Sequence, residues 1–284
     1  MMLEPLVSVL TITWNNKRDL QTTVESVLAQ NYKNLELIIV DGASRDGTRD
    51  YLASLQRENV RWISEPDSGI SDAYNKAINL AKGDTCIFMN SGDTFLDAET
   101  VTRAMNLIPA GVKVAESVIY GDYYQVVDSE LYFERADHTQ IYSTCSINHQ
   151  SAFIGGALCK RFAYDTRLKL EADYDYWMRL LAAGVPFIKI DTIIAKYDMS
   201  GISSSSPYQV HQAILRYILV ALNTKRKLSV WDGFHICWRA IRVQARITVR
   251  SLVGRSIILK FKKTLISLGL KKGPVNLNQA ARTG

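Results

Sequence analysis

The first hundred residues alternate between short apolar runs and segments whose apolar residues recur at intervals of three or four. The runs are short and rich in β-branched residues, which predicts buried strands at 6–13, 35–40, 60–64 and 85–90. Helical spacing extends from Leu20 to Leu28, after a predicted N-cap at Asn16, and from Ile70 to Ala81. Strands that alternate with helices predict an α/β fold with a parallel, doubly wound sheet.

The chain after residue 100 is less regular. Residues 117–165 hold shorter extended runs, which favour an α+β arrangement. A helix is predicted around Tyr174–Leu181 and a strand at 186–190, followed by a flexible Ser-rich connector at 200–207.

Polar side chains follow each of the four predicted strands. They are Asn15 and Asn16, then Asp41, then Glu65 and Asp67, and finally the tetrad Asn90-Ser91-Gly92-Asp93. One polar strand end is ordinary turn chemistry. Ligands of doubly wound sheets bind at the carboxyl ends of the strands, however, so four polar ends in series predict one shared site.

Composition narrows the class of protein. The 284 residues are 47% hydrophobic and 22% charged, which argues against disorder over most of the length. The four cysteines form no CxxC pair, so we expect a reducing compartment without a disulfide framework or a zinc site. We expect neither a signal peptide nor a membrane span, because a basic n-region and a long apolar stretch are both missing.

Charge divides the chain near residue 225. Residues 225–284 hold 14 Lys and Arg against Asp232 alone, a net charge of +13, whereas residues 1–224 hold 20 against 27 acidic residues. Apolar and basic residues of the tail follow helical spacing on adjoining faces: Phe234, Trp238, Ile241, Ala245, Val249 and Leu252, and Arg239, Arg242, Arg246 and Arg250. Such a helix is typical of an anionic membrane surface, which predicts contact through residues 229–272. A helix packed on the main domain is the alternative.

Five segments resemble, in order and spacing, the motifs of family-2 glycosyltransferases: VSVLTITWNN, LELIIVDGASRDGT, EPDSGISDAYNKAINLAKGD, FMNSGDTF and EADYDYWMRL. The likeness covers roughly residues 5–200 and points to bacterial enzymes that build exopolysaccharide, lipopolysaccharide and colanic-acid-like polymers. It implies a GT-A fold, which is a Rossmann-like, doubly wound mixed sheet. The implied catalytic domain is 1–224, with a nucleotide-sugar-binding half at about 1–97 and an acceptor-binding half at 98–224, before a basic amphipathic helical tail at 225–284.

The resemblance implies a donor site along the strand ends. Asp41 would contact the base of a nucleotide-diphosphate sugar, since a carboxylate accepts hydrogen bonds from its N–H groups; an Asp that caps the next turn is the alternative. The other implied donor-site residues are Thr11, Asn15, Asp72, Asn75, Lys76, Asn90 and Asp93. Lys76 would meet a phosphate as a point charge, although charges on a helix surface are usually only solvated.

Asp93 stands at the last acidic position of the family's DxD motif. The resemblance implies that it binds Mn²⁺ or Mg²⁺ beside the donor diphosphate. Asn90 stands where many relatives have Asp, so we expect weaker retention of the metal before the donor binds, but not its exclusion. A Ser-Gly-Asp turn that ends the strand is the alternative.

The family pattern places its general base at Asp173, ahead of the predicted helix. A base is needed because an acceptor hydroxyl is a poor nucleophile, and inversion in one displacement requires no covalent intermediate. Ala172 separates Glu171 from Asp173 where relatives often have Glu-Asp together, which leaves the role of Glu171 open. Acidic residues also favour helix N-termini, an alternative for Asp173 and a stronger one for Asp175.

The segment NHQSAF resembles the acceptor-side His-Gln segment of the family. The resemblance implies that His149 and Gln150, together with Trp177, lie on the acceptor or diphosphate side. A structural histidine near an apolar run is the alternative for His149.

These features predict an inverting glycosyltransferase of bacterial surface polysaccharide biosynthesis that acts on a saccharide or lipid-linked saccharide acceptor. We expect it in the cytoplasm, peripheral to the inner face of the cytoplasmic membrane. Two alternatives are a non-catalytic sugar-nucleotide-binding or scaffold protein at the membrane, and a sugar-phosphate nucleotidyltransferase. The latter would be expected to carry a Gly-rich, Arg-containing loop where this chain has TWNNKRD. Nucleic-acid binding is not expected, because no reader motif accompanies the basic tail.

Overall fold

The computed structural model describes residues 4–127, 130–141, 146–168 and 171–198, with Ile218, Leu219, Phe234, Trp238 and Ile241. The predicted connector at 200–207 and nearly all of the predicted tail at 225–284 lie outside the described residues. The chain to Tyr124 and the stretch Glu134–Asp198 belong to one compact unit, and Gln125–Phe133 belongs to a second. All the site residues discussed below lie in the first unit.

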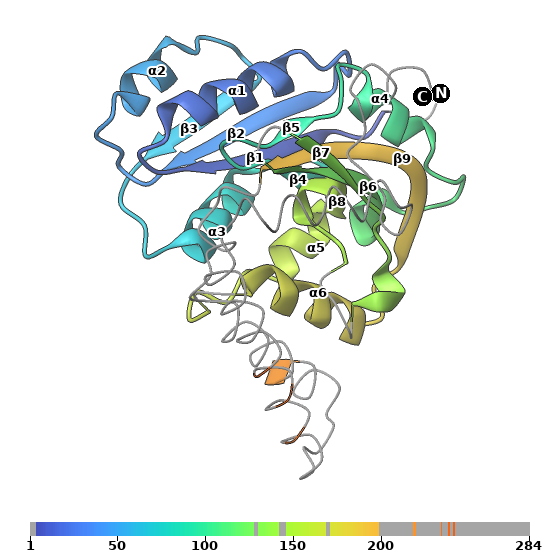
Figure 1. Ribbon diagram of the computed structural model, residues 1–284. Coiled ribbons are helices and arrows are strands. Elements are labelled where there is room, and N and C mark those ends of the chain that lie inside the picture. Colours follow the sequence, from blue (N-terminus) through green and yellow to red (C-terminus); the bar gives the residue numbers. More distant parts are fainter. Residues whose placement is uncertain are drawn as a thin grey trace. The chain divides into compact units, whose positions relative to one another are not determined.

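Four parallel strands form the first half of the sheet (Figure 1). β1 (Val7–Thr13) lies between β2 (Leu35–Asp41) and β4 (Thr85–Phe88), and β3 (Val60–Ser64) flanks β2. β2 is buried along its whole length, which explains why its sequence is apolar at nearly every position instead of alternating. The register places Thr13, Asp41 and Ser64 side by side, so the carboxyl ends of three strands meet at one edge.

Helices cover both faces of the sheet, as the sequence predicts. α1 (Lys17–Leu28), α2 (Thr48–Ser54) and α4 (Thr100–Asn106) lie over one face, and α3 (Ile70–Leu80), α5 (Gly156–Arg161) and α6 (Ala172–Ala182) lie over the other (Figure 1). Leu20, Val24 and Val27 of α1 are almost completely buried. Burial of each such side chain contributes about 1.5–3 kcal/mol. This burial holds the amphipathic helix against the sheet.

The second half of the sheet is antiparallel where β8 meets β4 and β6 and where β5 meets β9, so the sheet is mixed. The strand order is β3-β2-β1-β4-β8-β6-β9-β5, and β7 pairs with β6. The bounds are Thr94–Phe95 for β5, Val118–Val127 for β6, Glu130–Glu134 for β7, Ala152–Gly155 for β8 and Phe187–Asp198 for β9. Three 3-10 turns accompany them: η1 (Val114–Glu116), η2 (His138–Gln140) and η3 (His149–Ser151).

Glycine allows two of these junctions to close. A Cβ atom at Gly155 would collide with the backbone of Ala115, and one at Gly121 would collide with the carbonyl oxygen of Thr192. Only glycine lets the backbones approach this closely. The short strand β8 is therefore set tightly between η1 and the central strands.

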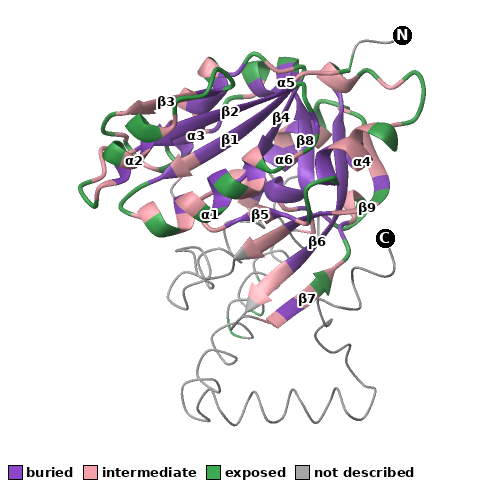
Figure 2. Ribbon diagram, turned by 90° about the horizontal axis from the view of Figure 1, so that it is seen from above, coloured by how far each residue is buried: buried purple, intermediate pink, exposed green. Residues whose placement is uncertain are grey.

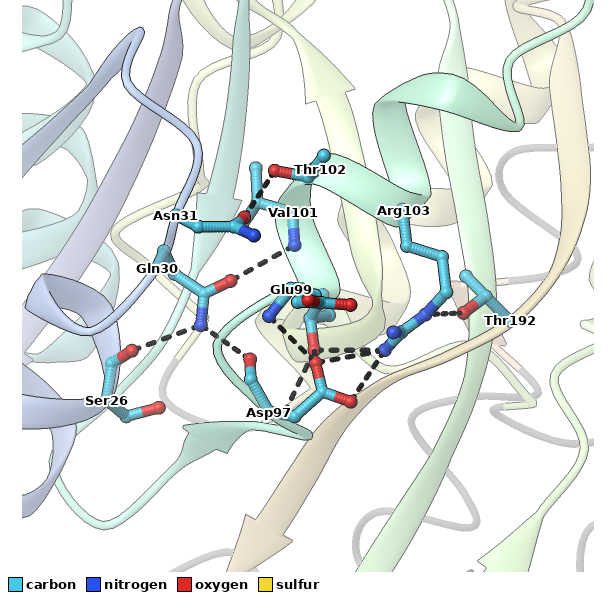
Figure 3. A network of polar contacts seen from close by, with 10 residues as sticks. Ser26, Gln30, Asn31, Asp97, Glu99, Val101, Thr102, Arg103 and Thr192 are labelled. Atoms are coloured by element: carbon cyan, nitrogen blue, oxygen red, sulfur yellow. Dashed lines mark hydrogen bonds and ion pairs between the residues drawn. The ribbon is translucent and has the colours of Figure 1, made fainter. Parts of the chain in front are cut away.

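A polar network joins α4 to the segment after α1 and to β9 (Figure 3). The Gln30 side chain donates to the carbonyl oxygen of Asp97 and accepts from the Val101 N–H at 3.1 Å. Arg103 binds both carboxylate oxygens of Asp97 and donates through Nε to Thr192 on β9. Arg103 thus links Asp97, which follows the two-residue strand β5, to β9, the strand that pairs with β5.

Buried residues concentrate in the central strands and on the helix faces that pack against them (Figure 2). None of the helices in the described ranges has both the length and the apolar character needed to cross a membrane.

Candidate active site

The tetrad after β4 forms a tight turn held by α1. The Asp93 N–H donates to the carbonyl oxygen of Asn90, and Gly92 has a φ of 101°, a left-handed conformation that favours glycine. The hydroxyl of Thr23 lies 2.9 Å from the carbonyl oxygens of both Asn90 and Asp93 and accepts from the Gly92 N–H. Ser91 donates to Ile12 at the end of β1. The turn therefore has a fixed shape and lies against the neighbouring strand end.

Asp93 is buried within this turn. Its Oδ2 accepts hydrogen bonds from the Asn90 N–H at 3.1 Å and from Gln150 Nε2 at 2.8 Å. Gln150 is itself 2% exposed and comes from η3, 57 residues further along the chain. The predicted metal ligand and a predicted diphosphate-side residue are thus in direct contact.

His149, the neighbour of Gln150 on η3, faces the other predicted carboxylate. Its Nδ1 lies 2.9 Å from Oδ2 of Asp173 at the start of α6. Its Nε2 lies 3.2 Å from Nδ2 of Asn90 and 3.4 Å from the hydroxyl of Tyr74. Burial lowers the pKa of His149, but the nearby charges of Asp173 and Asp93 outweigh it and leave the pKa above its ordinary value.

Asp173 lies in the first turn of α6, with its side chain partly exposed. Its side chain is 36% exposed, while its Oδ1 is buried with no hydrogen-bond partner among the described residues. Glu171, just before the helix, has a φ of 60° and serves as its N-cap residue. One carboxylate oxygen of Asp173 thus lies at ion-pair distance from His149, and the other is buried without a partner among the described residues.

Tyr74 completes the cluster, and the sequence analysis missed its role. In the sequence it is one position of the helical stretch from Ile70 to Ala81, but its hydroxyl accepts from Asn90 Nδ2 at 2.6 Å. Burial, reinforced by the charge of Asp173, raises the pKa of Tyr74 well above its ordinary value, so the hydroxyl stays protonated. Five side chains from four parts of the chain therefore form one cluster: Tyr74, Asn90, Asp93, His149 and Asp173, with Gln150 bonded to Asp93.

A second polar cluster lies at the ends of β2 and β3. Asp41 is fully buried, and its carboxylate accepts from the N–H and hydroxyl of Ser44 and from the hydroxyl of Ser64 at 2.6 Å. Asn15 joins the first two loops, because its Oδ1 accepts from the Arg45 N–H and its own N–H donates to Ser44. The structure thus gives Asp41 the turn-capping contacts of the alternative interpretation, whereas its contact with a nucleobase stays a prediction.

The predicted donor residues of α3 make contacts within the fold. Lys76 lies 2.8 Å from Glu65 and donates to the carbonyl oxygen of Pro66, and Asp72 accepts from the Ser68 N–H. Asn75 uses both ends of its amide on the backbone of Tyr164. These bonds hold the loop before α3 and join α3 to the segment after α5.

Two further predicted residues are completely buried. Thr11 is 0% exposed inside β1, and its hydroxyl has no partner in the described part of the chain. Trp177 is 0% exposed and packs edge-on against Tyr176 and Phe187. Trp177 therefore supports α6 from within the core.

Trp14 is a residue that the sequence analysis did not single out. It follows β1 directly and is 66% exposed, which is unusual for so large an apolar side chain. A Cβ atom at Gly42 would lie 3.2 Å from its ring and closer still to the carboxylate of Asp67. The sequence feature that could have selected Trp14 is a large apolar residue at a strand end where the neighbouring residues are polar.

The residues around Asp93 fit a divalent cation that is shared with a diphosphate. Within the described ranges, no group of three or more His, Cys, Asp or Glu could hold a metal by itself. Asn90 Oδ1 and Gln150 Oε1 are buried, however, without a partner among the described residues, and neutral oxygens are acceptable ligands for hard cations. Asp93 would hold the ion, and phosphate and water oxygens would complete its coordination.

A curled mixed sheet with its polar site at the carboxyl ends of the strands defines the GT-A class of glycosyltransferase folds. The mannosyltransferase PcManGT from Pyrobaculum calidifontis, solved in complex with GDP-Man and Mn²⁺, superposes with a TM-score of 0.61. The match covers 95% of this chain and 82% of that chain at 16% identity. At this identity the likeness is one of fold.

Sequence comparison identifies the family. The profile of glycosyl transferase family 2 matches residues 8–168. An uncharacterized glycosyltransferase of Mycobacterium tuberculosis is 31% identical over 209 residues, which are 70% of this chain and 78% of the relative. The putative teichuronic acid biosynthesis glycosyltransferase TuaG of Bacillus subtilis is 41% identical over 93 residues, 32% of this chain and 37% of TuaG. The chain belongs to glycosyl transferase family 2 and is a glycosyltransferase.

Proposed function

We propose that this glycosyltransferase moves a sugar from a nucleotide-diphosphate sugar to a saccharide acceptor with inversion at the anomeric carbon. The observation that carries the proposal is that η3 contacts both functional carboxylates: Gln150 bonds to Asp93, and His149 faces Asp173. A single displacement must hold the diphosphate and activate the hydroxyl at the same time. A carboxylate for each task, joined by one short turn, suits that requirement.

Asp173 is the general base of the proposal. His149 lies 2.9 Å from its Oδ2, and the side chain is 36% exposed, so the carboxylate would take the proton from the acceptor hydroxyl. The hydroxyl oxygen bonds to the anomeric carbon as the bond from that carbon to the diphosphate breaks, and the nucleoside diphosphate leaves. Mn²⁺ or Mg²⁺, when bound at Asp93, would offset the charge that grows on the leaving group.

We propose further that the acceptor is a lipid-linked saccharide of bacterial surface polysaccharide synthesis, met at the inner face of the cytoplasmic membrane. The name of the similar TuaG supports the class of polymer. Phe234, Trp238 and Ile241 support a membrane contact, since they are 64%, 60% and 59% exposed and have the spacing of one helix face. Apolar side chains among many basic residues suit an anionic lipid surface.

A thermal-shift screen of UDP-, GDP- and dTDP-sugars, with and without Mn²⁺, tests the donor proposal. A ligand that binds only the folded state raises the melting temperature by mass action. We expect one nucleotide class to raise it, and to raise it more with Mn²⁺. Transfer of label from that donor to a saccharide excludes a non-catalytic scaffold. Absence of a shift with every donor contradicts the proposal.

A further inference from the structure

The side chain of Asn90 presents two N–H groups to two acceptors inside the cluster. Its Nδ2 lies 2.6 Å from the Tyr74 hydroxyl oxygen and 3.2 Å from Nε2 of His149. Its Oδ1 is buried with no partner among the described residues. Turning the amide over would bury the NH₂ group where the structure provides no acceptor. Two buried N–H donors would then be unsatisfied, instead of one buried acceptor oxygen. The observed orientation is therefore the favoured one.

This orientation decides which nitrogen of His149 carries a proton. Nε2 lies 3.2 Å from the Asn90 amide nitrogen, which can only donate, so in the neutral ring Nε2 is the acceptor. The proton of the neutral ring then lies on Nδ1, which is 2.9 Å from Oδ2 of Asp173, within ion-pair distance. The hydrogen bond made by one imidazole nitrogen sets the tautomer of the ring.

We propose that Asn90 is a positioning residue that fixes the Nδ1-protonated tautomer of His149, through which it orients Asp173. The inference rests on the proposed function for the role of Asp173 as base, but not for the tautomer itself. With Nδ1 at 2.9 Å from Oδ2, the ring limits how far the carboxylate can rotate. An aspartate at position 90 would offer Nε2 an acceptor instead of a donor. The amide that departs from the family's acidic pattern thus has a function of its own.

The charged and titratable groups that face the ring come from three elements. Asp173 approaches from α6, Asp93 lies in the turn after β4, and Tyr74 approaches from α3. Phe88 and Tyr164 pack around Tyr74, and Phe88 also packs edge-on against the His149 ring. The neighbours of Nε2 are the Asn90 amide at 3.2 Å and the Tyr74 hydroxyl at 3.4 Å.

Two-bond ¹H–¹⁵N correlation spectra of the full-length protein, recorded at mildly alkaline pH, test the tautomer without donor or acceptor. The chain has four histidines, His138, His149, His211 and His235, and the signal that disappears in His149→Asn assigns His149. We expect the pattern of a ring protonated at Nδ1 only. Asn90→Asp should add a proton at Nε2 of His149. Asn90→Leu should give a mixture of the two tautomers of His149. The signals of His138 should stay unchanged and serve as the internal control.

Tyr74→Phe is the matched variant, because it removes the more distant donor and leaves the Asn90 amide in place. We expect it to keep the Nδ1-protonated pattern. An Nε2-protonated ring in the wild type, or an unchanged tautomer in a folded Asn90→Leu protein, overturns the inference. Because the assignment needs only His149→Asn, an Nε2-protonated ring in the wild type overturns the inference even if the Asn90 variants do not fold.

Turnover then tests the consequence for Asp173. His149→Asn keeps an N–H near the position of Nδ1 and should retain more activity than His149→Ala, which should lower kcat roughly 10-fold or more with an unchanged KM for the donor. Equal kcat losses in the two variants overturn the positioning role. If no transfer is found at all, the proposed function fails while the tautomer result stands.

Discussion

At the scale of single residues, the site depends on whether each polar group donates or accepts. Gln150 donates to Asp93, Asn90 donates to Tyr74 and His149, and His149 faces Asp173. The acceptor oxygens left unpartnered among the described residues are Asn90 Oδ1, Gln150 Oε1 and Asp173 Oδ1. Buried acceptors without partners are costly, so a site that keeps three of them is suited to groups that bring protons or positive charge.

The metal assignment gives the first prediction. Asp93→Ala should weaken metal-dependent donor binding far more than Asn90→Ala does, because only Asp93 offers the cation a full negative charge. Calorimetric titration with the donor found in the screen, with and without Mn²⁺, measures both losses. The titrations without metal serve as the control for damage to the donor site. Equal losses in the two variants, or an affinity that is independent of Mn²⁺ in the wild type, would refute the assignment.

Sequence reasoning found the carboxylates of the cluster but not the contacts between them. Asp93 and Asp173 belong to motifs with recognisable neighbours, so a resemblance is enough to select them. The bond from Gln150 to Asp93 spans 57 residues, and no local pattern encodes a contact at that separation. Tyr74 has the same periodicity as the other buried residues of its helix, so its polar role becomes visible only when Asn90 and His149 are placed beside it.

At the scale of elements, one acidic residue inside the buried strand β2 has a structural role at the end of the sheet opposite the site. Glu36 accepts from the Ser8 hydroxyl and the Lys82 N–H and pairs with Arg61 at 2.7 Å. Burial alone would raise the pKa of Glu36, but these hydrogen bonds and the charge of Arg61 outweigh it and hold the pKa below its ordinary value.

This network predicts a dependence of stability on acid. Because the folded-state pKa of Glu36 is lowered, its stabilising contribution is present above the ordinary Glu pKa and is lost as the pH falls through the folded-state value. Glu36→Gln should lower the free energy of unfolding by about 2–3 kcal/mol at neutral pH, since it leaves the Arg61 guanidinium without a carboxylate partner. Urea unfolding at neutral and acidic pH measures this. The difference between wild type and variant should shrink in acid, and a constant difference would rule out the ionised carboxylate as its source.

Elements differ in how far the sequence predicts them. β1, β2, β3 and α3 were predicted near their observed bounds, because each carries a complete apolar run or stripe. β5 has only two residues, and its pairing with β9 depends on contacts such as that of Arg103 with Thr192. The strand predicted at 186–190 extends to Asp198, since its neighbours β5 and β6 supply hydrogen bonds that the sequence of the strand does not predict.

At the scale of the whole molecule, the charge of the chain is divided between an acidic body and a basic C-terminal segment. The described residues show the body as an α/β unit of the GT-A class, and Phe234, Trp238 and Ile241 are exposed. The sequence predicts both parts, but the boundary at 224 and the tail helix at 231–252 stay predictions. A body that carries the site and a basic segment that carries the excess charge suit an enzyme brought to an anionic surface by electrostatics.

Deletion of residues 229–284 tests that division. The truncated protein should stay folded and bind donor, yet no longer co-sediment with vesicles that contain an anionic lipid, and the binding of the full-length protein should weaken in salt. A full-length variant with Arg239, Arg242, Arg246 and Arg250 changed to Gln is the control if truncation causes aggregation. Identical sedimentation of wild type, truncated protein and the Gln variant would end the membrane proposal.

The most direct test of the account is the turnover of Asp173→Asn with the donor and acceptor at saturation. Asp175→Asn is the matched control, because Asp175 lies on the same turn of α6 but is paired with Arg179 at 2.7 Å. We predict that Asp173→Asn keeps the fold and the donor affinity and lowers kcat by ~10²-fold or more, the scale of a lost general base, whereas Asp175→Asn lowers mainly stability. A kcat of Asp173→Asn close to that of the wild type would contradict the account.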